Sequence, residues 1–512
     1  MSHDPYNPDA PRSTNGIIPT GEATGILPVD DGKFSPVTVI ANEKIRQSFD
    51  EICMRQIANM RRSPGVTRTV LNPDGHAGYG APIGCVMSSP SHIYPGPVGV
   101  DIKCSMSLLQ LDLPAPSVDD RKLRRAIIEA ILARTPTGAG NRVAPRGRRF
   151  DAAALGRRIV TEGASEGVLR ELGIPVHWAG RCEDSRHLGH DGTIAPLLTR
   201  LEEHVRTGSR RGEKGSDIFE TKMRQLGSYG GGNHFGECEI VHVDDTPRAR
   251  ETAKVFGLVD GHVAFMSHCG SRGWGAMLAD RAFKDFQKFF DTWNVPLPGG
   301  DRHMVHAPLG TELADNYIDD MALGANFATV NHLLINALVL EAFQEVIPGC
   351  TGEFVYFISH NIARQEPLNN KMEWVHRKGA TRAFPAGHPG LKGTVFAQTG
   401  HPILLPGNPQ AGSSVMVAEK GAEQSCYSVN HGAGRRMSRT AATKTLDQQR
   451  VDQSFAACDI LFNGRCYPID EAPGAYKEFE DVLDSVKQAG LASEVARLKA
   501  RFVIKDGDKA DD

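Results

Sequence analysis

The 512-residue sequence lacks the long apolar stretches of a membrane protein. It has no run of 18 or more apolar residues, so no transmembrane helix is predicted. Its first residues, MSHDPYNPDAPRSTNG, do not follow the charged-then-apolar pattern of a signal peptide and are expected to form a disordered arm. The ten cysteines are scattered and include no CxxC pair, which indicates a reducing compartment. We therefore expect a cytoplasmic protein with no membrane partner.

The sequence also lacks a strong excess of one charge. Its formal net charge is −3, so a nucleic-acid partner would need a local basic surface. Two stretches are candidates: residues 141–158 hold six arginines against one aspartate, and residues 206–214 add a second cluster. Such runs are usually solvated loops, and the alternative is a contact surface for a phosphate backbone.

No internal repeat and no regular alternation of strand and helix is visible, which argues against a Rossmann fold or a barrel. Apolar periodicity predicts helices over residues 120–132 and 330–347, and a pair of helices over 474–500 broken at Gly490. Short β-branched and aromatic runs predict strands over residues 263–267, 354–359 and 402–405. An α+β fold is the resulting prediction.

Several histidines stand beside glycine or asparagine where a strand is predicted to end. His268 and His360 each follow such a strand, and His234 follows three glycines. Asp101 and Cys104 are spaced so that both can face one ion across a tight turn. A carboxylate, a thiolate and imidazoles together suit zinc or manganese better than calcium. Any one of these histidines is more often a satisfied core residue than a ligand, and the case for a metal site depends on the whole group.

His431 has a different setting. It lies in CYSVNHGAGRRMSRTAA, where small residues follow it and three arginines come next. Small residues allow close approach of a ligand, and arginines favour an anion.

These stretches resemble the RtcB-type RNA ligases, GTP-dependent enzymes that join RNA ends in tRNA splicing and repair. The resemblance extends from about residue 70 to residue 507 and is carried, in the family's order, by PDGHAGYGAPIG, GVDIKC, GGGNHFGE, SHCGSRGWG, SHNIARQE, VHRKGATRAFPAG, PILLPG, NHGAGRRMSRTAA, DEAPGAYK and VIKDG. It implies one large α+β catalytic domain with mixed sheets surrounded by helices, over residues 36–507. A divergent basic insertion region is expected over residues 140–225. A disordered or loosely packed arm (1–35) and a disordered tail (508–512) are expected to flank the domain.

The resemblance also implies roles for individual residues. His431 would be the nucleophile that carries GMP. Two manganese ions, with the cysteine bridging, would be held by Asp101, Cys104, His234, His268 and His360. Contacts to GTP are implied at Asn233, Glu237, Asn408, Ser413, Gly432, Ala433, Gly434 and Lys505. The last of these requires an ordered C-terminal segment. Departures from the usual family pattern occur at Asn72, Asn408 and Asn430.

The function implied is a GTP- and manganese-dependent RNA ligase. It would join 2′,3′-cyclic phosphate or 3′-phosphate ends to 5′-hydroxyl ends through a histidine–GMP intermediate and a guanylylated RNA 3′ end. An archease-type activator is a possible partner of such an enzyme. The main alternative is a dinuclear-metal phosphoesterase without a nucleotide intermediate, for which His431 and Lys505 would have no purpose. A non-catalytic RNA-binding protein is a third reading, and the retained ligand set argues against it.

Overall fold

The first sheet is built mostly from the N-terminal part of the chain. The structure, a computed structural model, describes residues 15–138, 145–208, 215–368 and 370–507. Seven strands follow the order β1-β2-β3-β4-β5-β13-β12, with β3 and β4 parallel and all other neighbours antiparallel. Their bounds are Ile18–Pro19, Thr24–Val29, Phe34–Ile40, Arg68–His76, Ile83–Ser89, Lys371–Lys378 and Asn361–Leu368.

The second sheet follows the order β11-β7-β9-β8-β19-β16-β15, and β18 pairs with β19 in parallel. The bounds in that order are Gly352–Ser359, Ser105–Pro114, His262–Cys269, Phe235–Val243, Ala492–Lys505, Gly412–Ala418, Pro402–Asn408 and, for β18, Leu461–Phe462. Two small ribbons complete the described strands, β6 with β10 and β14 with β17. They span His92–Ile93, Ala307–Pro308, Ala380–Arg382 and Ser428–Asn430.

The register of the second sheet brings four strand ends to one edge. Ser105, the first residue of β7, pairs with both Cys269 at the end of β9 and Ser359 at the end of β11. Phe235, the first residue of β8, pairs with His268. Residues just outside these four ends are therefore neighbours in space, although they are far apart in the sequence.

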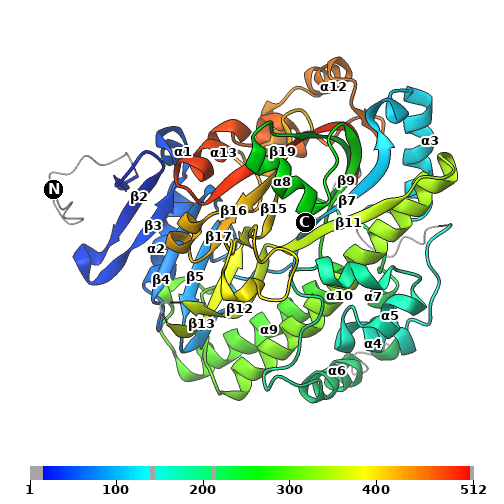
Figure 1. Ribbon diagram of the computed structural model, residues 1–512. Coiled ribbons are helices and arrows are strands. Elements are labelled where there is room, and N and C mark those ends of the chain that lie inside the picture. Colours follow the sequence, from blue (N-terminus) through cyan, green and yellow to red (C-terminus); the bar gives the residue numbers. More distant parts are fainter. Residues whose placement is uncertain (1–14, 139–144, 209–214, 369, 508–512) are drawn as a thin grey trace.

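Helices lie around the sheets. Figure 1 shows α4, α5, α6, α7 and α10 at the lower right and α9 at the bottom centre, with α3, α8, α12 and α13 around the upper part. The helices in chain order are α1 Glu43–Ser48, α2 Glu51–Arg61, α3 Arg121–Leu132, α4 Ala154–Glu162, α5 Glu166–Glu171, α6 Ala195–Gly208, α7 Gly215–Met223, α8 Pro247–Phe256, α9 Arg272–Trp293, α10 Glu312–Val346, α11 Arg439–Thr445, α12 Gln448–Ala457 and α13 Phe479–Gln488. Helices and mixed sheets form one large domain, which confirms the predicted α+β class.

Helix α10 is the core of the helical side. It packs against α3, α4, α6 and α9. It is long and apolar enough to cross a membrane, but 94% of its most apolar window is buried inside the protein. The predicted helix over 330–347 is confirmed and begins earlier, at Glu312. The first half of the helix was not predicted because Asp319, Asp320 and Asn326 interrupt the apolar pattern. In the structure the Asp320 carboxylate accepts from Arg200, and the Asn326 side chain donates to backbone oxygens.

One predicted element was wrong. Of the pair of helices predicted over 474–500, only the first exists, as α13, and residues 492–505 form strand β19 instead. This strand pairs with β8 on one side and β16 on the other. Pairing on both sides satisfies its backbone groups and overrides the local helical pattern.

The N-terminal region also differs from the prediction where the structure describes it. Residues 1–14 lie outside the described residues, as do residues 508–512 of the expected tail. Residues 15–35, expected to be a disordered or loosely packed arm, include β1, β2 and the start of β3. Their apolar side chains Ile17 and Val29 are buried in a cluster with α2, so burial of these residues holds the segment in the first sheet.

Candidate active site

Five predicted metal ligands meet at the shared edge of four strands. Asp101 and Cys104 precede β7, His234 precedes β8, His268 lies near the end of β9, and His360 follows β11. The Cys104 Sγ lies 3.1 Å from His268 Nε2 and 3.3 Å from His234 Nε2. Sheet register, rather than sequence proximity, therefore assembles the cluster.

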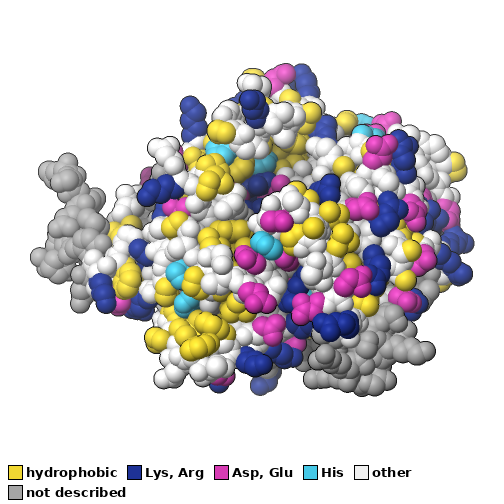
Figure 2. Space-filling model, turned by 90° about the horizontal axis from the view of Figure 1, so that it is seen from below, with side chains coloured by type: hydrophobic (Ala, Val, Ile, Leu, Met, Phe, Trp, Pro, Cys, Tyr) yellow, Lys and Arg dark blue, Asp and Glu magenta, His cyan; other side chains and the backbone are white. Residues whose placement is uncertain are grey.

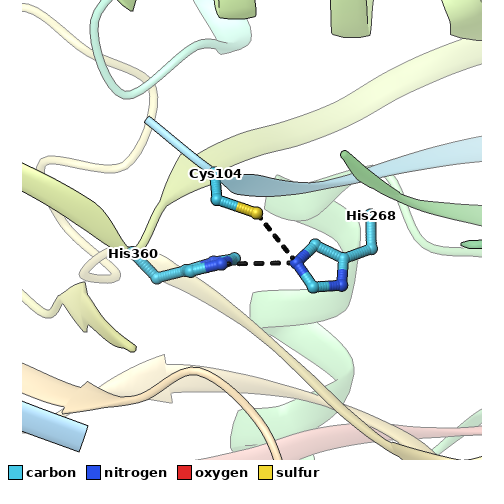
Figure 3. A group of neighbouring side chains, drawn as sticks. All are labelled: Cys104, His268 and His360. Atoms are coloured by element: carbon cyan, nitrogen blue, oxygen red, sulfur yellow. Dashed lines mark hydrogen bonds between the residues drawn. The ribbon is translucent and has the colours of Figure 1, made fainter. Parts of the chain in front are cut away.

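The cluster consists of two groups that share the thiol. The first is Cys104, His268 and His360, and the second is Asp101, Cys104 and His234; within each, the ligand atoms lie within 4.8 Å of one another. His268 Nε2 is 3.3 Å from His360 Nε2, and His234 Nε2 is 3.0 Å from Asp101 Oδ2. Figure 3 shows the imidazoles of His268 and His360 and the thiol of Cys104 pointing toward one another.

The protonation states favour a cation at this place. Burial, together with neighbouring imidazoles, holds the pKa of His268 and His360 well below the usual histidine value. Neutral imidazoles have the lone pair that a metal needs. The Asn233 carbonyl lies 3.1 Å from His268 Nδ1, so Nδ1–H donates to it and Nε2 faces the cluster. Carboxylate, thiol and imidazole donors aimed at one small volume fit one or two borderline divalent ions.

His431 lies directly beside this cluster. Its ring centroid is 4.6 Å from that of His360. Its Nδ1 is 2.7 Å from Asp74 Oδ2 and 2.9 Å from the Gly379 carbonyl oxygen. Two acceptors on Nδ1 fix a proton there, which leaves the Nε2 lone pair free as a nucleophile.

Asp74 is a candidate functional residue that the sequence analysis did not assign. It is fully buried, and the sequence separates it from His431 by 357 residues. Gly434 has φ +74°, and a Cβ there would lie 2.3 Å from the Asp74 carbonyl oxygen. This glycine therefore allows the His431 loop to approach Asp74, a role that the sequence analysis did not foresee. The sequence feature that could have indicated Asp74 is its place in PDGH, beside the glycines of the same motif.

All of the predicted site residues line one cavity of about 890 Å³. Its wall includes the metal-ligand cluster and His431. It also includes the residues predicted to contact the nucleotide: Asn233, Glu237, Asn408, Ser413, Gly432, Ala433, Gly434 and Lys505. None of the sequence-predicted site residues lies elsewhere.

A second group of charges surrounds Glu471 on the same wall. Its carboxylate lies 3.0 Å from Lys505 Nζ, 2.6 Å from an Arg439 guanidinium nitrogen and 3.1 Å from one of Arg435, and it accepts from the Tyr476 hydroxyl. Burial raises the pKa of Glu471, but Lys505, Arg439 and Arg435 outweigh burial and lower it to about 2. Two of the three arginines after His431 are thus held by protein carboxylates. The third, Arg436, is exposed and donates to the Gly474 carbonyl.

Glu237 has an acidic neighbour that the sequence analysis did not assign. Glu239 is two residues along β8, on the same face, and both side chains are buried. Burial and the charge of Glu239 raise the pKa of Glu237 well above its usual value, while burial raises that of Glu239 to about 7. Both carboxyl groups are therefore protonated more readily than an exposed glutamate.

The arginines of the basic stretch are mostly paired with acidic side chains. Arg146 and Arg148 contact Glu345 and Glu341 of α10, and Arg158 pairs with Glu162. Figure 2 shows Lys and Arg interspersed with Asp and Glu on the face seen from below Figure 1. The arginines at 210 and 211 lie outside the described residues. The structure thus gives most of the described arginines of residues 141–158 acidic partners, and an RNA contact there stays a prediction.

Comparison with known proteins gives one consistent family. The family described as "tRNA-splicing ligase RtcB" matches residues 56–506. A "tRNA-splicing ligase RtcB" of Thermococcus kodakarensis is 33% identical over 485 residues, covering 90% of this chain and 92% of that protein. One of Methanococcus maripaludis is 32% identical over 509 residues, covering 96% and 99%. An "RNA-splicing ligase RtcB homolog 1" of Entamoeba dispar is 31% identical, covering 93% and 86%.

Proposed function

Because this chain belongs to the RtcB family of RNA-splicing ligases, we propose that it joins RNA ends with GTP and manganese. One end carries a 2′,3′-cyclic phosphate or 3′-phosphate, and the other a 5′-hydroxyl. The family match and His431 favour this over a phosphoesterase that works without a nucleotide. An archease-type activator and a cytoplasmic location stay predictions from the sequence.

The observation that carries the proposal is the setting of His431. Asp74 and the Gly379 carbonyl hold the proton on Nδ1, and Nε2 faces the cavity beside His360. Nε2 attacks the α-phosphorus of GTP, a P–N bond forms, and the bond to the β-phosphate oxygen breaks with release of diphosphate. The imidazole then carries positive charge, which the buried Asp74 carboxylate stabilises.

A divalent metal would be held by the two ligand groups that share Cys104. Bound there, it would neutralise phosphate charge and act as a Lewis acid toward phosphoryl oxygens. We propose two manganese ions, one for each group.

The guanine nucleotide would extend toward Glu237, Ser413 and Lys505, which share the cavity wall. Guanine presents two donors on its N1–H and N2–H₂ edge, and the two oxygens of one carboxylate can accept from both. Lys505 is already held by Glu471, so its ammonium position is set before any ligand enters. Ordered β19 supplies the C-terminal segment that this role requires.

The RNA steps follow from the histidine–GMP intermediate. Water opens a cyclic phosphate to a 3′-phosphate, whose oxygen attacks the phosphorus of GMP and breaks the P–N bond. The 5′-hydroxyl oxygen then attacks the RNA 3′-phosphorus, and GMP leaves. Both transfers need in-line positioning and stabilisation of charge on phosphoryl oxygens.

The first step can be tested without RNA. Protein is incubated with manganese and GTP labelled at the α-phosphate and then separated by denaturing electrophoresis. We expect an acid-labile label on the wild type and none on His431→Ala. His262→Ala, which removes a part-exposed histidine away from the cavity, is the matched control and should label normally. Label on His431→Ala, or none on folded wild type with any divalent metal, contradicts the proposal.

A further inference from the structure

One part of the cavity wall, called the α9 arm below, is not used by the proposed chemistry. Four residues of α9 line it: Asp280, Phe283, Lys284 and Gln287. Their spacing of three and four residues places them on one helical face. The helix begins next to the metal-ligand cluster, where the Ser271 backbone N–H donates to Asp101. At 1.5 Å per residue, these four residues lie about 12 to 22 Å along the axis from Arg272. The arm thus leads away from the reacting centre along α9.

Aromatic rings line this arm. Tyr79 lies 6.0 Å from His303, and His303 lies 6.2 Å from Phe283, measured between ring centroids. The three rings come from three separate segments: the loop between β4 and β5, the loop after α9, and α9 itself. All three line the cavity.

Of these three rings, that of Tyr79 is exposed to solvent. The Tyr79 side chain is 72% exposed, and no other tyrosine in the described part of the chain is among the exposed large apolar residues. An exposed ring of this size in a cavity wall forgoes the burial that stabilises most tyrosines. A planar ligand that covers it would recover that stabilisation.

The backbone that carries Tyr79 is nevertheless firmly held. The Lys378 ammonium donates to the carbonyls of Tyr79 and Ala81, at 2.7 and 3.0 Å. The Gly78 N–H donates to the Gln56 side chain at 3.1 Å. Gly80 has φ +68°, and a Cβ there would lie 2.4 Å from the His303 Cβ, so glycine lets this loop rest directly on His303. The backbone at Tyr79 is therefore fixed in place before a ligand binds.

The charges of the arm argue for bases rather than phosphates. Lys284 is paired with Asp280 at 2.5 Å, and both side chains are exposed. Lys378 is occupied by two backbone carbonyls. What remains available is ring surface, and single-stranded RNA is commonly held by stacking its bases on such rings.

We propose that Tyr79, supported by His303 and Phe283, stacks on the bases of the RNA strand next to the ends being joined. This inference rests on the proposed ligase function and assigns the α9 arm as its RNA subsite. Tyr79 is a positioning residue here: it touches the substrate away from the reacting phosphorus. Because every base has a ring face, the subsite recognises a single-stranded end rather than a sequence.

The test compares Tyr79→Ala with Tyr79→Phe, which keeps the ring. We expect Tyr79→Ala to raise the KM for RNA by about 5- to 150-fold, the loss typical of one stacked base, with a much smaller change in kcat. Tyr79→Phe should stay within about 2-fold of wild type. Trp293→Ala removes an exposed ring at the end of α9, 69% exposed and outside the cavity wall, and should also stay within about 2-fold.

A direct probe places the fluorescent base 2-aminopurine, one position at a time, at the last three nucleotides of either RNA strand. Stacking on the wild type should quench it in at least one strand, and Tyr79→Ala should relieve that quenching. Wild-type KM and quenching in Tyr79→Ala would overturn the proposal. The proposal would also be overturned if Tyr79→Ala raised the KM for GTP and not that for RNA, because the Tyr79 ring would then stack on guanine. Labelling of His431 by GTP is measured in parallel: its failure in the wild type counts against the ligase function, whereas normal labelling with unchanged RNA binding counts against the subsite alone.

Discussion

Two clusters of buried polar groups share one cavity wall, and they differ in how far they are satisfied. Around Glu471, three cations and a tyrosine hydroxyl contact one carboxylate. Around Cys104, imidazole nitrogens face one another and a thiol, and the Nδ1 atoms of His234 and His360 have no hydrogen-bond partner. Buried polar groups are normally paired, so the Cys104 cluster has the character of a site that receives a ligand. The Glu471 cluster, whose charges are already paired, has the character of a structural ion-pair network.

The largest expected effect is loss of the shared thiol. Cys104→Ala removes the one ligand common to both groups, so we expect metal content to fall and ligation to drop by more than about 100-fold. Folding should persist, because burial keeps His268 and His360 neutral and His234 keeps Asp101 as its partner. Metal analysis and circular dichroism on the same sample check this. Wild-type ligation by Cys104→Ala would mean that the Cys104 cluster is not a ligand-binding site and is structural, like the Glu471 cluster.

The next effect concerns Asp74, which contacts Nδ1 of His431. Asp74→Asn keeps the size of the side chain but removes the charge that stabilises a cationic His431. We expect labelling by GTP to slow by about 100-fold or more, with metal content unchanged. Single-turnover labelling rates measure this. An unchanged rate would mean that the Gly379 carbonyl alone fixes the proton on Nδ1.

The Glu471 cluster should respond in stability. Glu471→Gln leaves Lys505, Arg435 and Arg439 without their shared anion, and we expect a loss of about 3 to 5 kcal/mol in the free energy of unfolding. Glu353→Gln breaks an exposed pair with His177 and should cost less than about 1 kcal/mol. Urea denaturation of both variants gives the comparison. Equal costs would show that burial does not separate the two kinds of pair.

The stability contributed by the Glu471 carboxylate should depend on pH. The folded pKa of Glu471 is lowered to about 2 from the usual 4.5. A lowered folded pKa contributes stability that is present above the unfolded value and is lost as pH falls through the folded value. We therefore expect about 3 kcal/mol to disappear between pH 4.5 and pH 2. Glu471→Gln should lack this part of the pH profile, and an identical acid profile in the variant would contradict it.

The smallest expected effect is in the basic stretch. Arg146 and Arg148 are exposed or partly exposed and paired with Glu345 and Glu341. Their joint replacement by alanine should change stability by at most about 1 kcal/mol per pair and leave the salt dependence of RNA binding unchanged. If both arginines contacted RNA phosphates, the slope of log affinity against log salt would instead fall by about 2.

The sequence predicted the residues of the site better than the elements that hold them. His268 and His360 were placed correctly at strand ends because short β-branched runs followed by a polar residue are a local signal. Asp74 and Glu471 were missed because their partners lie far along the chain, and no local pattern reports a contact over 357 residues. Strand β19 was predicted as a helix for the same reason: its neighbours β8 and β16 decide its conformation.

The place of β19 also has a consequence for how the protein is made. This strand comes after every other strand in chain order, yet it lies between β8 and β16 in the middle of the second sheet. A ribosome that has synthesised residues up to 490 has produced two part-sheets that are not yet joined. Lys505 enters the cavity wall only with the last residues of this strand. The cavity wall is therefore completed only once β19 has been made, and a chain that lacks β19 would expose two unpaired strand edges to aggregation.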